Sequence, residues 1–167
     1  MPAGLKRVFV TPLDAVDTSD KEGVGTIRRE GNKTYKYVKL QNVTATVAVA
    51  DGDVVSYRAD QYDTHHVVSD ATDADAAPIA AGVTLATIAG VAGTAYYVWI
   101  QIQGHKILLQ ALAGTPVAGD ELVASTTDKT ATRRTYAGTT PAIVPNGSLL
   151  GVVQHVTNKD VILRCPQ

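Results

Sequence analysis

Residues that could bind a metal ion or act as a catalytic nucleophile are few in this sequence and widely separated. His65 and His66 are the only adjacent histidines. Because neighbouring residues of a β-strand point to opposite faces, their imidazoles are poorly placed to bind one metal ion. Cys165 is the only cysteine, so neither a disulfide nor the paired thiolates of a zinc site can form within the chain. We therefore predict no metal centre.

Acidic and glycine-rich segments also lack the spacing that catalysis would need. Asp70, Asp73 and Asp75 resemble the start of a calcium loop, but the glycine and the distal glutamate of that motif are missing. Asp51 and Asp53 flank a glycine, so we expect them to form a turn and not a glycosidase carboxylate pair. The sequence contains no Gly-x-Ser-x-Gly motif and no phosphate-binding loop. It predicts a protein that is not an enzyme and has no cofactor.

Aromatic and basic side chains offer surfaces for binding instead. Tyr97 and Trp99 share one face of an alternating segment with Gln101. Exposed aromatic residues beside amides are typical of protein-interface or sugar-binding surfaces, whereas the same face would be buried if a second sheet covered it. The sequence leaves both arrangements open. Arg133 and Arg134 belong to a basic loop that we expect to contact an acidic protein surface or solvent.

We expect β-strands to position these residues, because Val, Thr, Tyr and Gly prevail over helix-forming residues. The clearest strand is 96–102, where apolar residues occupy every second position. Gly104 then interrupts the alternation, so 95–110 is predicted to be a hairpin. A short helix or a loop is expected at 69–77. Further strands are predicted at 35–40, 43–49, 54–58, 64–68, 82–88, 121–125, 148–156 and 161–165.

The predicted fold class is all-β, as a small barrel or a jelly-roll-like sandwich with an extended N-terminal arm. Residues 33–167 would form the body. Residues 1–32 contain few apolar side chains after the start and several flexible, polar positions, which is typical of an arm. The candidate contact residues of this arm are Leu5, Arg7, Val8 and Phe9.

Two parts of the body contain the same sequence phrases. Gly52-Asp53 and Gly119-Asp120 each precede a strand. Gly82 follows Asp53 by 29 residues, and Gly151 follows Asp120 by 31. The body is therefore predicted to contain two fused β units, at about 45–110 and 111–167, with a shared core.

Composition excludes several classes of partner. The formal net charge is −1, so the whole molecule lacks an electrostatic attraction to nucleic acid or to an anionic membrane. Residues 1–40 hold eight Lys or Arg against five Asp or Glu, whereas residues 41–80 hold one against seven. No apolar run is long enough to span a bilayer, and no signal peptide is expected. The single cysteine indicates synthesis in a reducing cytoplasm.

Several of these phrases, taken in order, resemble one known family. A Gly82-Val83 strand, a Val98-Trp99-Ile100-Gln101 strand, the Gly119-Asp120 turn and Leu150-Gly151-Val152 follow the pattern of capsid decoration (cement) proteins of tailed bacteriophages. The resemblance covers roughly residues 45–165. It implies a β-barrel or jelly-roll-like body, often a homotrimer, and no catalytic residues.

The resemblance also implies a partner and a location. The partner would be the major capsid protein, bound on the outer surface of the virion where capsomers meet, and the protein would stabilise the shell after synthesis in the cytoplasm of a bacterial host. The alternative is a carbohydrate-binding or head-fibre attachment module, in which Tyr97 and Trp99 would stack on sugar rings.

Overall fold

The computed structural model describes residues 8–59, 61, 64–74, 78–90, 92–110, 112–134 and 149–165. In these ranges the chain forms strands and loops and contains no α-helix, so none is long and apolar enough to cross a membrane. The predicted all-β class is confirmed. The strands are β1 (Val16–Asp17), β2 (Ile27–Glu30), β3 (Lys33–Leu40), β4 (Val54–Tyr57), β5 (His66–Val68), β6 (Ala80–Thr84), β7 (Tyr96–Ile107), β8 (Glu121–Ala124), β9 (Ala131–Arg133), β10 (Leu149–His155) and β11 (Asp160–Arg164).

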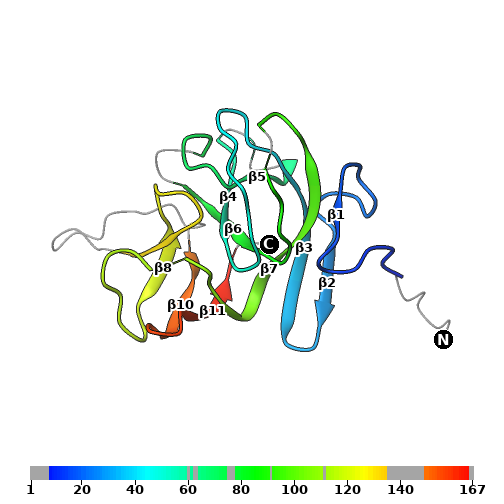
Figure 1. Ribbon diagram of the computed structural model, residues 1–167. Helices are drawn as coiled ribbons and strands as arrows, with labels where there is room; N and C mark the ends of the chain where they lie inside the picture. The colour runs from blue at the N-terminus through cyan, green and yellow to red at the C-terminus, as the bar shows by residue number, and fades with distance from the viewer. Residues whose placement is uncertain are drawn as a thin grey trace, which may run out of the picture.

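Five of the strands close into a barrel (Figure 1). β3 pairs with β5, β5 with β4, β4 with β6 and β6 with β7, and β7 pairs back onto β3 along Thr34–Leu40. Among the pairs of described strands, β3–β5 alone is parallel. Closure satisfies the backbone groups that an open sheet would leave at its edges.

β7 belongs both to the barrel and to the sheet that extends from it. Its first part pairs with β3, and Gln103–Ile107 pairs with β11, after which the sheet continues through β10 and β8 to β9. The predicted hairpin at 95–110 is therefore wrong, because Gly104 lies inside one continuous strand. Gly104 has a φ of +93°, and a Cβ there would lie 2.6 Å from the carbonyl oxygen of Asn32. The glycine permits a close backbone approach and not a chain reversal.

The sequence predicted either a short helix or a loop at 69–77. Its described residues, 69–74, form turns and no helix. The Asp70 carboxylate accepts a hydrogen bond from the backbone N–H of Thr72 at 2.8 Å, an interaction that favours a turn over a helix.

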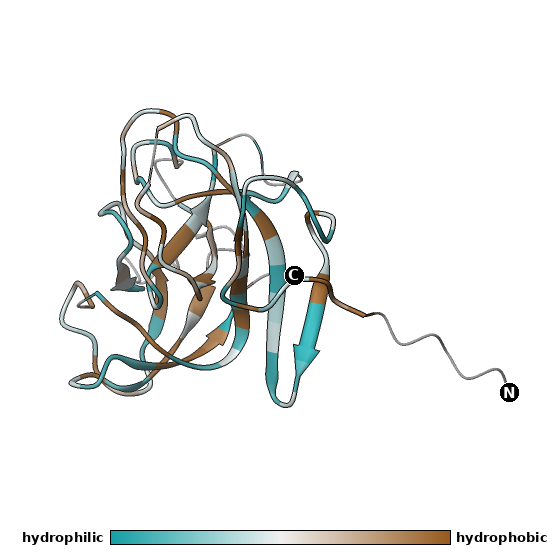
Figure 2. Cartoon of the chain, turned by 45° about the vertical axis from the view of Figure 1, so that its right-hand side comes forward, coloured by the Kyte–Doolittle hydropathy of each residue, from teal (hydrophilic) through white to brown (hydrophobic). Residues whose placement is uncertain are grey.

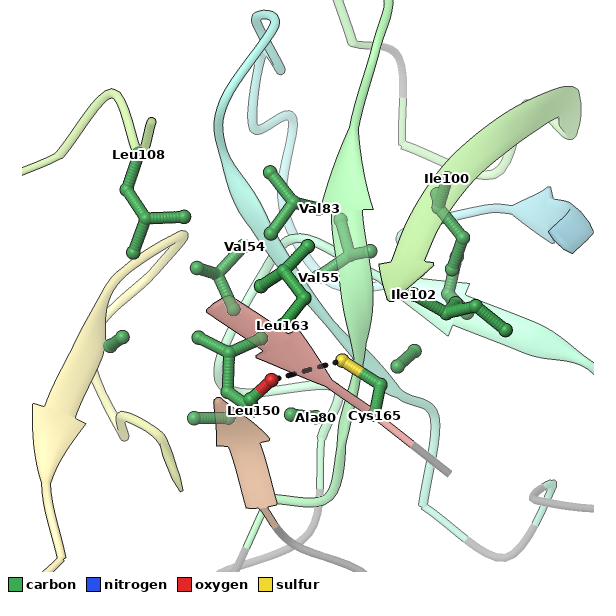
Figure 3. Close-up of a cluster of buried hydrophobic side chains, with 14 of the residues drawn as sticks. Val54, Val55, Ala80, Val83, Ile100, Ile102, Leu108, Leu150, Leu163 and Cys165 are labelled. Carbon is green, nitrogen blue, oxygen red and sulfur yellow. Dashed lines mark hydrogen bonds between the residues drawn. The ribbon is translucent and has the colours of Figure 1, made fainter. Parts of the chain in front are cut away.

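The core fills the barrel and continues into the extended sheet. Alternate residues of β7, namely Val98, Ile100 and Ile102, point into it, as their spacing predicted. Side chains from the second half of the chain complete the cluster, including Leu150 and Leu163 (Figure 3). Neither half of the body therefore has a core of its own.

The two Gly-Asp turns have the same hydrogen bonds. Asp53 accepts a bond from the backbone N–H of Ala50 at 2.9 Å, and Asp120 accepts one from that of Val117 at 2.8 Å. In both turns the aspartate's own N–H donates to a carbonyl three residues earlier, at 3.1 Å. The turns lead into β4 and β8, which pair with β6 and β10 respectively.

These matching turns belong to a symmetric part of the sheet. The order β4-β6-β7-β11-β10-β8 reads the same from both ends if β4 corresponds to β8, β6 to β10 and β7 to β11. β7 and β11 are antiparallel neighbours, as a local twofold axis between them would require. The correspondence extends to β5 and β9, which pair antiparallel with β4 and β8 respectively, whereas the barrel strand β3 has no counterpart among the described residues of the second half.

Residues 8–30, predicted as part of an extended arm, have little regular structure but lie on the barrel. β1 pairs with Tyr97 and Val98 of β7. β2 forms a hairpin with β3, with Glu30 opposite Lys33. The predicted end of the arm at residue 32 lies inside the β2–β3 hairpin, because Arg29 and Glu30 belong to β2 and Lys33 begins β3. Figure 2 shows that β2 is mostly hydrophilic, whereas most residues of β3 are buried on both faces of the strand.

Candidate functional site

The described residues contain no group of three or more His, Cys, Asp or Glu side chains that could hold a metal ion. His66 is buried, and its Nδ1 lies 2.7 Å from the Oε1 atom of Gln61. Burial lowers the pKa of His66, which favours the neutral imidazole. Asp53 is buried in its turn, whereas Asp51 is exposed and forms an ion pair with Lys106. These two carboxylates have structural roles and do not face a common site.

Lys36 is the most deeply buried charged side chain of the barrel interior, with 2% of its surface exposed. Its Nζ atom donates a hydrogen bond to the Tyr57 hydroxyl at 2.9 Å. Burial lowers the pKa of Lys36 and raises the pKa of Tyr57 and of Cys165 to about 12 each. A lysine with a lowered pKa can act as a base or nucleophile, but this one is enclosed by the core, so we assign it no reaction.

Trp99 is fully buried and has no face available to a ligand. The centroid of the Tyr37 ring lies 5.1 Å from that of the indole, and the centroid of the Phe9 ring lies 5.5 Å from it in a T-shaped arrangement. The indole Nε1 donates a hydrogen bond to the Thr11 hydroxyl at 2.9 Å. The N-terminal segment therefore covers Trp99, which is the buried arrangement that the sequence left open beside an exposed interface or sugar-binding face. Tyr97 is partly buried and stacks on Tyr37 at 6.5 Å.

The segment that covers Trp99 is held by polar contacts as well as by packing. The Glu22 carboxylate accepts bonds from the backbone N–H groups of Val10 and Thr11 at 2.6 and 2.7 Å. The Arg28 guanidinium lies 5.0 Å above the Phe9 ring and donates to the Thr11 carbonyl at 3.0 Å. Hydrogen bonds to a charged group are stronger than neutral ones, and here one carboxylate fixes two consecutive residues.

On either side of Phe9 the side chains point outward. Val8 and Val10 are 83% and 76% exposed, the two largest values among the exposed large hydrophobic residues. An extended segment with one inward anchor presents its neighbours to solvent in a fixed orientation. Of the predicted contact residues of the arm, Phe9 is thus an internal anchor and Val8 is exposed. Leu5 and Arg7 lie outside the described residues.

The two predicted contact arginines of the basic loop interact with carboxylates of this chain. The Nε atom of Arg133 lies 3.1 Å from Asp120, and Nη1 of Arg134 lies 3.0 Å from Glu121. Both pairs join the start of β8 to the end of β9. Arg133 and Arg134 are therefore not a single cationic patch reserved for a partner, although the side chain of Arg133 is nearly half exposed.

A groove that sequence reasoning missed lies between the β2–β3 hairpin and the paired strands β7 and β11. Its volume is about 540 Å³. Its cationic and polar walls come from segments that are far apart in the sequence. It is lined by Arg29, Gly31, Asn32, Lys33, Thr34, Gln103, Gly104, His105, Ile162, Leu163 and Arg164.

Backbone pairing fixes the shape of this groove. The Thr34 hydroxyl donates to the Oε1 atom of Gln103 at 3.0 Å, and Gln103 is also the register partner of Arg164. At Gly104 the absence of a side chain lets the hairpin turn at Asn32 approach β7. The groove therefore forms where β7 leaves β3 and pairs with β11.

The lining of the groove is positively charged. Arg29, Lys33 and Arg164 are cations at neutral pH, and none of the lining residues is an aspartate or glutamate. His105 lies at the groove and faces the carboxylate of Asp160 at ion-pair distance. An excess of basic residues in 1–40 was a sequence signal for part of this site, but nothing in the sequence places Arg164 beside it.

Comparison with protein-family models, with curated proteins and with solved structures finds no match to this chain.

Proposed function

We propose that this protein is a decoration protein of a tailed-bacteriophage head, which binds the outer capsid surface as a homotrimer and stabilises the shell. The observation that carries the proposal is the N-terminal segment, in which Phe9 is anchored while Val8 and Val10 face solvent. The order of sequence phrases that resembles the decoration family supports the same function. The proposed partner is the major capsid protein.

The geometry of the segment suits binding to a repetitive protein surface. Phe9 and the Glu22 carboxylate already hold the segment in place, so little conformational entropy remains to be lost when Val8 and Val10 are covered. Burying two valines contributes only about 2 kcal/mol per subunit. Three linked subunits on one lattice site would multiply such weak contacts through effective concentration.

The carbohydrate-binding alternative is less well supported. It requires aromatic rings that a sugar can reach, and Trp99 is covered by Phe9 and Tyr37. Tyr97 alone is partly exposed on that face.

Replacing the two exposed valines tests the proposal. We expect Val8→Ser with Val10→Ser to weaken binding to empty phage heads by at least about 30-fold, because each subunit of the trimer loses roughly 2 kcal/mol of apolar burial. The matched control is Val117→Ser with Val156→Ser, which changes two other exposed valines. Co-sedimentation with heads at graded protein concentrations measures both. Equal affinity of the two double variants would show that the segment is not the contact surface.

A further inference from the structure

We propose that the groove between the β2–β3 hairpin and the β7–β11 pair is a binding site for a short, extended, acidic segment of a protein partner. The proposal goes beyond the capsid function, because it follows from the charge and shape of the groove and does not depend on which assembly the protein joins.

The charge of the groove defines the chemistry of the ligand. Arg29, Lys33 and Arg164 come from three different strands and all line one volume of about 540 Å³. In the part of the chain that the structure describes, none of the three forms an ion pair with a carboxylate. Two are arginines, whose planar guanidinium can bind a carboxylate through two parallel hydrogen bonds.

The shape of the groove suits an extended chain. Gly31 contributes no side chain to its wall and has no atom within 4 Å of the place where a Cβ would lie, so the backbone of a bound segment can approach closely there. Thr34 and Gln103 bond to each other and fix the wall between them. Glutamate side chains of a bound peptide are long enough to reach the cations that line the groove.

A protein segment fits these observations better than a nucleic acid does. Affinity for a polynucleotide grows with the number of phosphates that the protein neutralises, and strong binders make six or more such contacts. This groove offers three permanent cations on a molecule with a formal net charge of −1. A local positive site on a nearly neutral molecule favours a short acidic peptide over a long polyanion.

The groove is separate from the N-terminal segment. Arg28 and Arg29 are adjacent on β2 and point to opposite faces, Arg28 toward Phe9 and Arg29 into the groove. A segment bound in the groove therefore does not itself cover Val8 and Val10. Loss of one interaction leaves the other measurable.

A labelled peptide tests the site directly. We would titrate the full chain into a blocked, fluorescent eight-residue peptide of alternating Glu and Ser, and into the same peptide with Gln in place of Glu, and follow fluorescence anisotropy at low salt. We expect saturable binding of the Glu peptide alone. Arg29→Gln with Arg164→Gln should weaken it at least tenfold, whereas Arg133→Gln with Lys39→Gln, which removes the same charge elsewhere, should change it less than twofold.

Three results would overturn the proposal. Equal affinity for the Glu and Gln peptides would show that carboxylates are not recognised. Equal weakening by the groove variant and by the control variant would show that only net charge matters. Tighter binding of a single-stranded oligonucleotide of the same charge would assign the groove to nucleic acid. Thermal unfolding of each variant establishes that the fold is intact, and binding to phage heads is a separate measurement.

Discussion

The sequence predicts which face of β7 Trp99 occupies, but not whether that face is exposed. Its place on the polar-aromatic face of β7 follows from the alternation of apolar residues in 96–102. Whether that face is open or covered depends on Phe9, which is 90 positions earlier in the chain and packs against the indole in a T-shaped arrangement. Local periodicity predicts the face, but only the tertiary structure shows what covers it.

Because the chain has a single tryptophan, its fluorescence reports on this cover. We predict a blue-shifted emission that acrylamide quenches weakly. Phe9→Ala should shift the emission to the red and lower the free energy of unfolding by about 1–3 kcal/mol, since the ring contact and part of the apolar burial are lost. Val8→Ala is the control, because Val8 is exposed and should change neither quantity. An unchanged emission maximum in Phe9→Ala would contradict the packing described here.

We expect the buried charge of Lys36 to lower the free energy of unfolding. Its ammonium group is buried and has a neutral hydroxyl as its hydrogen-bond acceptor. We predict that Lys36→Met raises the free energy of unfolding at pH 7 by about 1–3 kcal/mol, because an apolar side chain of similar length avoids the desolvation penalty. Lys39→Met, a change on the same strand at a partly exposed position, should have little effect.

The effect of Lys36→Met should depend on pH in a defined direction. Burial places the pKa of Lys36 in the folded protein below its ordinary value of 10.5. Between these two values the unfolded chain binds a proton that the folded protein does not, so wild-type stability rises with pH. The penalty is complete below the folded pKa and disappears as the pH approaches 10.5.

Denaturant unfolding of both proteins at several pH values below 9 measures this difference. Above that limit the unfolded chain loses protons that Tyr57 and Cys165 keep in the folded protein, because burial raises the pKa of each to about 12, and this loss of stability would obscure the effect of Lys36. An advantage of Lys36→Met that grew with pH would contradict the assignment.

At the scale of elements, Gly104 explains why one strand was predicted to be a hairpin. A glycine with positive φ between two apolar runs is typical of a tight turn. Here the positive φ belongs to a strand that bends between two partners, β3 and β11. The partners are distant in sequence, so the pattern around residue 104 contains no information about them.

Alanine substitution measures what Gly104 contributes. Gly104→Ala combines an unfavourable φ with a Cβ placed 2.6 Å from the Asn32 carbonyl oxygen, and we expect a loss of more than about 2 kcal/mol in the free energy of unfolding. Gly93→Ala is the matched control, with a φ of +77° and no atom within 4 Å of the added Cβ. It should cost about 1 kcal/mol. Equal losses in urea unfolding would show that the close approach at Asn32 is unimportant.

The positions of the two Gly-Asp turns could be predicted from the sequence. Gly52-Asp53 and Gly119-Asp120 were placed before strands, and both lead into strands with the same turn hydrogen bonds. Turn chemistry is local, which is why it could be read without knowing the fold. The cationic groove shows the opposite case, because its walls come from residues 29, 31–34, 103–105 and 162–164, which only the tertiary structure brings together.

At the scale of the whole molecule, the all-β class could be predicted from composition. The choice between a barrel and a sandwich could not. Closure depends on the pairing of β3 with β7, whose register partners are about 60 residues apart. Strand propensity does not identify partners at that separation. The barrel also accounts for the position of the N-terminal segment, which lies on the outside of the closing pair and covers its aromatic face.

The two surfaces proposed as binding sites lie in different places on the molecule. The anchored N-terminal segment presents two exposed valines, and the groove on the other side of β2 presents three cations. Neither place resembles a catalytic centre in the described part of the chain. Both suit a protein that works by contact with other proteins.

The measurement that tests the central proposal most directly is the native mass of the full chain by light scattering, followed by sucrose-gradient sedimentation with empty, expanded heads of the encoding phage. The account predicts a stable trimer that migrates with the heads and saturates at a fixed number of copies per head. A monomer that stays at the top of the gradient at every concentration would contradict it.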